Sequence, residues 1–208
     1  MSEDEKRPQL FDPSKDEIVS GERLAALAHP LRLRMLGLLR VFGPSTATKM
    51  AERCDVSSGL TSYHLRQLAE SGLIEPVPAP ENSHNREKWW GPTLRSTYTT
   101  NVHDGPEAQA IGAEYLRSVV EQHKASTSQW LNVQHEWGTR WLEASTISDV
   151  SLRLTADELR GLQDEIAELM ARYPRHDSVR AAEGDDDPSV VVTVQYQLFP
   201  NPEQDPEE

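Results

Sequence analysis

The chain has 208 residues and a net charge of −13, with 37% hydrophobic and 26% charged residues, which suits one large domain or two small ones and excludes a fibre. No apolar run approaches the roughly 20 residues of a membrane span, and the N-terminus carries no hydrophobic signal segment, so we expect a cytoplasmic protein without a membrane partner. Cys54 is the only cysteine, which excludes an internal disulfide, a cysteine-only zinc site within one chain and an iron–sulfur cluster.

The negative charge is unevenly distributed along the chain. Residues 21–100 hold 10 Lys/Arg and 7 Asp/Glu, a net charge of +3, whereas residues 101–208 hold 8 Lys/Arg and 21 Asp/Glu, a net charge of −13. A nucleic-acid binder must offer a positive surface to the phosphates. The total charge argues against such a partner, but the mildly basic middle segment keeps it open.

The N-terminal part begins with an expected disordered arm and continues with helices. Residues 1–17 are charged, acidic and without periodicity, and they bring too little apolar surface to offset the entropy of ordering them. From Arg23 onward, apolar residues recur at steps of three and four, which predicts helix. Pro30 marks where a second helix can begin, and Gly43 and Pro44 end it.

Two further helices follow, joined by a short turn. Ser45 or Thr46 caps the first and Ser57 caps the second, because their hydroxyls can accept from the first-turn N–H groups. Gly72 ends the second helix. The residues that we expect to face the core are Met50, Ala51 and Cys54 in the first helix and Thr61, Leu65 and Leu68 in the second.

A β-hairpin is predicted next. Residues 73–78 and 86–92 read as two short strands, and a polar loop at residues 79–85 joins them. Two helices, a turn, a third helix and a hairpin form the order of a winged helix-turn-helix. We therefore predict a winged helix-turn-helix domain over residues 18–100, with the hairpin as its wing.

For residues 101–199 we predict a long linker or dimerisation helix followed by a strand–helix–strand unit. Residues 200–208 form an acidic tail. The helix is expected over residues 107–144, and a capping box at Thr155 opens a shorter one. Alternating apolar residues predict strands around residues 150–154 and 189–199. The fold class is thus mainly α with a small β component. The stripe expected to pack on a partner surface is Leu116, Val120, His123, Thr127, Trp130, Gln134, Trp137 and Trp141.

The segment VSSGLTSYHLRQLAESGLIE resembles the recognition helix and first wing strand of the ArsR-type winged helix-turn-helix regulators. The preceding segments ALAHPLRLRMLGLL and TATKMAERC match the same pattern, and the resemblance extends over about residues 18–95. It implies a dimeric repressor that binds DNA. Independently of the resemblance, a helix presented after a tight turn can enter the roughly 12 Å wide major groove and present its N-terminal half to base edges.

Candidate DNA contacts lie on this helix and in the wing. Arg66 is the expected phosphate or guanine contact, whereas His64 lies beside the inward face and is expected to be half-buried and hydrogen-bonded. A polar helix face and a charged hairpin that are merely solvated are the alternative interpretation. The full set of predicted DNA-binding residues is Ser58, Ser62, Tyr63, Arg66 and Gln67 on the helix, Lys49 before it, and His84, Asn85, Arg86 and Lys88 in the wing.

Other chemistries find less support in the sequence. Trp130, Trp137 and Trp141 either line a pocket for an apolar small-molecule effector or form core. Cys54 reads as a small buried apolar residue, and His123 and His135 are too far apart along a helix to share one metal ion, although a site across a dimer stays open. We find no catalytic motif and expect neither an enzyme nor a cofactor.

The sequence therefore predicts a cytoplasmic transcriptional regulator, a repressor by the resemblance, that binds an inverted repeat in double-stranded DNA as a homodimer. Two alternatives remain: a winged-helix module that binds another protein and not DNA, and a metal-responsive regulator. Steep salt dependence of binding distinguishes a DNA binder from a protein-docking module.

Overall fold

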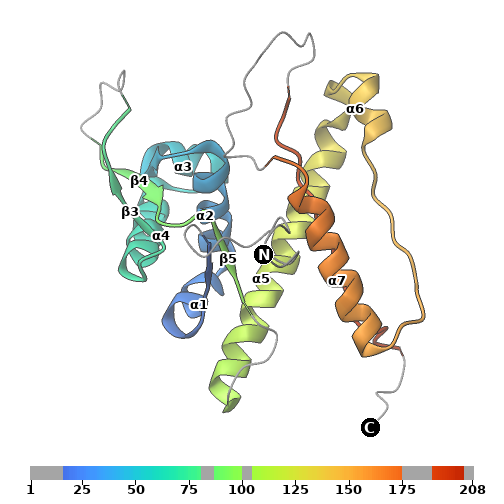
Figure 1. The fold of residues 1–208 in the computed structure, drawn as a ribbon. Coiled ribbons are helices and arrows are strands. Elements are labelled where there is room, and N and C mark those ends of the chain that lie inside the picture. Colours follow the sequence, from blue (N-terminus) through green and yellow to red (C-terminus); the bar gives the residue numbers. More distant parts are fainter. Residues whose placement is uncertain (1–15, 81–86, 100–104, 175–188, 204–208) are drawn as a thin grey trace, which may run out of the picture. The chain divides into compact units, whose positions relative to one another are not determined.

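The computed structural model describes residues 16–80, 87–99, 105–174 and 189–203 (Figure 1). Compact units divide the chain at Gly138. The first unit contains the described residues up to Gly138, and the second contains those from Thr139 onward. The fold is mainly helical with small sheets, as predicted.

Four helices and a three-stranded sheet build a winged helix-turn-helix. The helices are α1 (Gly21–Leu27), α2 (Pro30–Phe42), α3 (Ala47–Cys54) and α4 (Ser58–Glu70). The helices begin and end within a few residues of the predicted positions. Pro30 and the capping hydroxyls of Thr46 and Ser57 determine where α2, α3 and α4 begin. Their core residues, each at most 1% exposed, include Leu24, Leu27, Met35, Leu36, Leu39, Met50, Leu65 and Leu68.

The wing is an antiparallel sheet in the order β2–β4–β3. It contains β2 (Ser45–Thr46), β3 (Ile74–Val77) and β4 (Trp89–Pro92). Both indoles of β4 are buried, with Trp89 5% and Trp90 6% exposed. A Cβ at Gly91 would lie 2.9 Å from a methyl carbon of Val77, so the close pairing of the two wing strands requires glycine there.

The structure also contains a short two-stranded parallel sheet that was not predicted. β1 (Asp16–Ile18) pairs with β5 (Ser96–Tyr98). The arm that we expected to be disordered through residue 17 therefore gives its last two residues to a strand. Asp16 is 3% exposed and receives both Nε and Nη2 of Arg95, at 3.2 and 2.8 Å.

The long helix is shorter than predicted. α5 (Gly105–Val133) is followed by a single 3-10 turn (Gln134–Glu136) and then by an extended Trp137. The predicted continuous helix over residues 107–144 is wrong at this point: the α-helix ends at Val133 and a new helix begins at Thr139. Among the described helices none is both long and apolar enough to span a bilayer.

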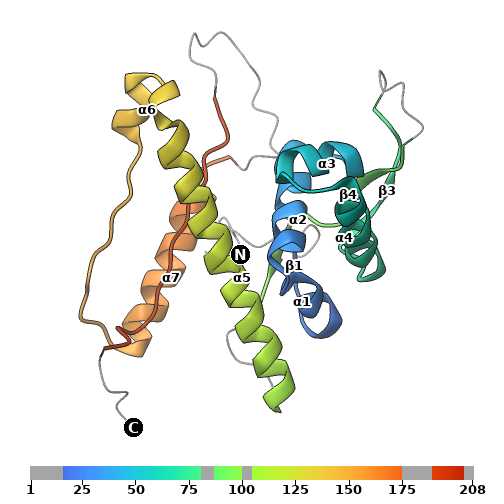
Figure 2. The same ribbon diagram turned by 180° about the vertical axis from the view of Figure 1, so that it is seen from behind.

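The face of α5 that packs on the winged helix differs from the predicted stripe. α5 lies against α1 and α2 (Figures 1 and 2). Tyr115 and Ser118 are buried in this contact, and the Ser118 hydroxyl donates to the carbonyl of Ala28 at 2.9 Å. Leu116 and Val120, which belong to the predicted stripe, are 42% and 48% exposed. Leu116 and Val120 are therefore the exposed apolar part of the predicted stripe, whereas His123, Thr127 and Trp130 of the same stripe are half-buried.

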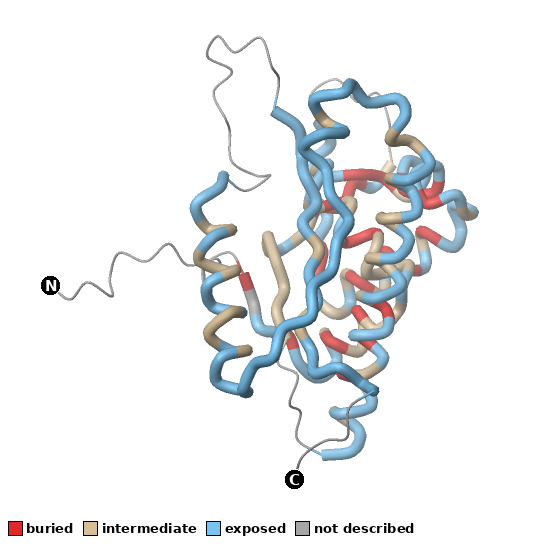
Figure 3. Tube along the Cα trace, turned by 90° about the vertical axis from the view of Figure 1, so that its right-hand side faces the viewer, coloured by how far each residue is buried: buried red, intermediate tan, exposed pale blue. Residues whose placement is uncertain are grey.

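The second unit contains α6 (Thr139–Ala144) and α7 (Ala156–Ala171), with the predicted capping box at Thr155 and Glu158. The strands expected around residues 150–154 and 189–199 are not formed: neither segment is helix or strand in the described part of this unit. None of its described residues is buried (Figure 3). Apolar side chains of the extended segments remain exposed, among them Val150 at 76% and Val192 at 66%.

The buried ion pair of β1 gives the first prediction. Asp16→Ala should lower the free energy of unfolding by about 3 kcal/mol, because it leaves the mostly buried guanidinium of Arg95 without its carboxylate. Glu114→Ala, which breaks an exposed pair with Arg117 on α5, should cost about 0.5 kcal/mol or less. Urea denaturation of both variants measures the difference. Equal losses would show that β1 is not held by the ion pair.

Candidate functional site

The exposed face of α4 is set by what lies under it. Thr61, Leu65 and Leu68 are all at most 1% exposed, as predicted. The Thr61 hydroxyl donates to the carbonyl of Ala47 at 2.8 Å, which fastens α4 to the first turn of α3. Asp55, at φ 57° between the two helices, takes the left-handed conformation that turns the chain. The orientation of α4 is therefore determined by core packing and by one side-chain hydrogen bond.

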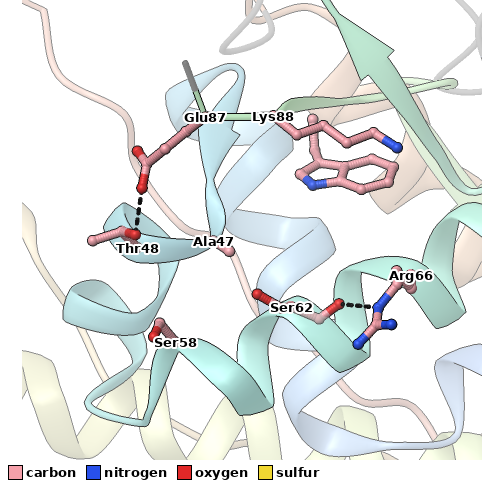
Figure 4. Close-up of a pocket in the computed structure, with 8 residues that line it drawn as sticks. Ala47, Thr48, Ser58, Ser62, Arg66, Glu87 and Lys88 are labelled. Carbon is pink, nitrogen blue, oxygen red and sulfur yellow. Dashed lines mark hydrogen bonds between the residues drawn. The ribbon is translucent and has the colours of Figure 1, made fainter. Parts of the chain in front are cut away.

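Polar side chains occupy the opposite face of α4. Ser58 and Arg66 are exposed, Tyr63 is 50% exposed, and Ser62 and Gln67 are half-buried. Arg66 donates from Nε to the carbonyl of Ser62 at 3.1 Å (Figure 4), and its side chain is exposed. The predicted helix residues thus lie together on one accessible surface.

A recess of about 370 Å³ lies between α3, α4 and the wing (Figure 4). Its wall is formed by hydroxyls, two cations, one carboxylate and an indole. Of the predicted residues, Ser58, Ser62 and Arg66 on α4 and Lys88 in the wing line this recess. The residues that line it are Ala47, Thr48, Ser58, Ser62, Arg66, Glu87, Lys88 and Trp90.

Two lysines lie over the buried tryptophans of β4. Nζ of Lys49 lies 4.5 Å from the ring centre of Trp89, and Nζ of Lys88 lies 4.1 Å from that of Trp90. A cation over an indole face is attracted by the ring's electrons. Because both indoles belong to the rigid strand β4, they restrict where the two ammonium groups can lie.

Two polar lining residues, Thr48 and Glu87, were missed by the sequence analysis. The Thr48 hydroxyl donates to Oε1 of Glu87 at 2.6 Å, which links α3 to the start of β4. The two residues are 39 positions apart, and no local pattern connects them. A carboxylate next to Lys88 in a predicted basic wing was the only available signal.

His64 is buried more deeply than expected and makes a different contact. It is 4% exposed, and its Nδ1 has no hydrogen-bond partner among the described residues. Its ring lies 4.4 Å from that of His29, whose Nδ1 accepts from the N–H of Leu31 and caps α2. Burial, then His29 and Arg32, lower the pKa of His64, and burial and Arg32 lower the pKa of His29. The pair is therefore held in its neutral form.

A family model described as a helix-turn-helix domain matches residues 27–77, from the end of α1 to the end of β3. Residues 27–77 form a helix-turn-helix domain. Together with β4, this domain is a winged helix, and α4 occupies the position of its second helix. No curated protein matches the chain.

Some solved structures align with the chain at low similarity. A doubly substituted ZitR from Lactococcus lactis, in apo form, is 18% identical over 67% of this chain and 83% of that chain, with a TM-score of 0.29. RV1404 from Mycobacterium tuberculosis is 17% identical over 71% and 82%, with a TM-score of 0.29. A ZitR variant in complex with DNA is 18% identical over 66% and 73%, with a TM-score of 0.27. Scores this low do not decide the fold, which rests on the elements described above.

The other predicted residues lie in different places. His84, Asn85 and Arg86 fall outside the described residues. The rings of Trp130 and Trp137 meet edge to face at 6.0 Å, whereas Trp141 belongs to α6, beyond the end of α5. The three tryptophans therefore do not share one helix face, as the stripe required.

Metal ligands do not converge in the described part of the chain, where no group of three His, Cys, Asp or Glu side chains is arranged to hold an ion. Cys54 is buried among the apolar residues of the winged helix, as expected. This burial raises the pKa of its thiol.

The histidine pair predicts how stability depends on pH. A histidine whose pKa is lowered by folding takes up its proton more readily when unfolded, so its contribution is complete above about pH 6.5 and is lost as the pH falls toward the lower folded pKa. Stability should therefore fall as the pH drops below about 6.5, by at most about 1.4 kcal/mol per pH unit for each such histidine. His64→Gln should give a shallower slope in urea denaturation series over this range. An unchanged slope would show that His64 is not protonated on unfolding.

Proposed function

We propose that this protein is a sequence-specific, double-stranded DNA-binding transcription regulator in which α4 is the recognition helix. The observation that carries the proposal is the shared surface of α4 and the wing. Its hydroxyls and Arg66 share a recess with Lys88 of the wing, on a winged helix, and Lys49 of α3 lies over Trp89 of the same wing strand. The proposed activity is binding alone and involves no catalysis.

The chemistry of this surface suits a duplex. An α-helix fits the major groove, where an arginine can donate two hydrogen bonds to guanine and hydroxyls can bond to base edges. The exposed side chains of Arg66, Ser58 and Tyr63 would occupy the groove. Lys49 and Lys88 would meet phosphates and position the helix without reading sequence.

The charge distribution supports the same surface. Residues 21–100 carry a net charge of +3 and the rest of the chain is acidic. Acidic parts repel phosphates, so DNA approaches the chain along its basic segment. Binding to random duplex should be weak for the same reason.

We further propose a homodimer that binds an inverted repeat, as the resemblance to ArsR-type repressors implies. In a two-fold dimer, two recognition helices contact half-sites about one DNA turn apart, roughly 34 Å. The exposed face of α5 with Leu116 and Val120 is the proposed contact between copies, because it lies away from the residues that pack on α1 and α2. Repression, and control by a small-molecule effector, are part of this proposal.

The interface predicts the effect of substitutions on α4. Genomic fragments that bind the full-length protein are selected first, and the enriched duplex is then titrated with each variant. Arg66→Ala should weaken binding by about 1 to 3 kcal/mol and relax the preference at one base pair. Ser62→Ala and Tyr63→Ala should weaken it as well.

Arg160→Ala, at an exposed arginine of α7, is the matched control and should bind as wild type does. Wild-type affinity in all three α4 variants would contradict the placement of the recognition helix. If no duplex is enriched at all, the result favours the alternative of a winged-helix module that binds another protein.

The proposed dimer predicts the result of placing a charge on α5. Val120→Glu should convert the protein from dimer to monomer in sedimentation equilibrium at micromolar concentration, because a carboxylate buried without a partner disfavours the contact. Its affinity for the enriched inverted repeat should fall, since the two half-sites are no longer linked. Thermal unfolding serves as the folding control. A wild-type protein that sediments as a monomer and still binds the repeat tightly would contradict the dimer.

A further inference from the structure

Glu87 places a negative charge on the surface that is proposed to meet DNA. It is half-buried, lies immediately before β4, and lines the recess together with the cations of Arg66 and Lys88. A carboxylate at this place opposes the binding of phosphates. Its position is also fixed, because the Thr48 hydroxyl donates to it at 2.6 Å.

Thr48 lies in the first turn of α3, where an anion is favoured. The N-terminus of a helix carries a partial positive charge and attracts carboxylates and phosphates alike. The Thr46 hydroxyl already accepts from the N–H of Lys49 at 3.4 Å and caps this turn. The carboxylate of Glu87 thus has the same surroundings that a backbone phosphate would find there: a hydroxyl donor and a helix N-terminus.

The α3 end of the recess is coupled to the recognition helix. The Ala47 carbonyl accepts the Thr61 hydroxyl of α4, which joins the first turn of α3 to α4. A phosphate bound near Thr48 would therefore lie in the same recess as Arg66. In Figure 4 the Thr48–Glu87 pair and Arg66 occupy opposite sides of the recess.

We propose that Glu87 is an affinity-limiting residue: its carboxylate, held by Thr48 at the recess, repels the DNA backbone phosphates that approach this surface. This inference rests on the proposed DNA-binding function. Such a residue weakens contact with any duplex, whatever its sequence. It leaves discrimination between sequences to the base contacts of α4.

A purely structural role for Glu87 leads to a different expectation. If the Thr48–Glu87 hydrogen bond only held the wing against α3, a neutral acceptor at residue 87 would serve equally well. Glu87→Gln keeps an oxygen that accepts from Thr48 and removes only the charge. Its effect on DNA affinity therefore distinguishes a limiting charge from a wing anchor.

The test compares Glu87→Gln with the wild-type protein on two duplexes, the enriched fragment and a random one of equal length. We expect tighter binding to both, by about 3- to 10-fold at low salt, because an exposed charge near a phosphate contributes at this level. The gain should shrink as salt rises and screens the carboxylate. Glu107→Gln, which removes one exposed charge at the start of α5, is the matched control and should change affinity little.

Unchanged or weaker binding of Glu87→Gln, with Arg66→Ala still impaired, would overturn the role of Glu87 and leave the DNA-binding function intact. A gain that equals that of Glu107→Gln would overturn it too, because total charge would then explain the effect. If neither the wild-type protein nor any variant binds duplex DNA, the proposed function itself fails. Circular dichroism of each variant confirms that the fold is retained.

Discussion

The burial of one face of α4 is the constraint on which the proposed interface depends. Thr61, Leu65 and Leu68 lie in the core of the winged helix, and Thr61 also bonds to the first turn of α3. Because a helix repeats every 3.6 residues, burying these positions forces the intervening polar residues outward. The recognition surface is thus a consequence of core packing. Substitutions that loosen the core would therefore displace Arg66 as well as lower the free energy of unfolding.

Electrostatics refine this surface in opposite directions. Lys49 and Lys88 are localised over the two buried indoles of β4, so their charges are presented with less loss of side-chain freedom on binding. Glu87, which lines the recess together with Lys88, adds a negative charge to the same surface. A strongly positive surface would bind any duplex, whereas a surface of mixed sign makes affinity depend more on base contacts. The acidic remainder of the chain acts in the same sense.

The winged helix was predictable because its signals are local. Pro30, Ser57 and Gly72 mark helix ends through their own stereochemistry, and the buried faces follow from apolar spacing. The parallel pairing of β1 with β5 was not predictable in this way, since Asp16 and Arg95 are 79 residues apart. The Thr48–Glu87 contact escaped for the same reason.

In the C-terminal half, by contrast, the local patterns did not predict the structure correctly. Apolar spacing predicted a continuous stripe on one long helix. It did not indicate that the helix is interrupted between Val133 and Thr139, or that α5 packs through Tyr115 and Ser118. Alternating residues predicted two strands, yet a pattern states only which faces are apolar and not whether a neighbouring strand exists. The exposed valines of these segments are the clearest remaining difference between prediction and structure.

Hydroxyl-radical footprinting of the full-length protein tests the central claim most directly, because it reports which side chains a bound duplex covers. Tyr63 on α4 is 50% exposed and Tyr173, just beyond α7, is 68% exposed, so both should be oxidised in the free protein. We predict that a saturating amount of the enriched duplex protects Tyr63 and leaves Tyr173 as reactive as before. Unchanged oxidation of Tyr63 in the complex would contradict the account, because α4 would then not be the helix that enters the groove.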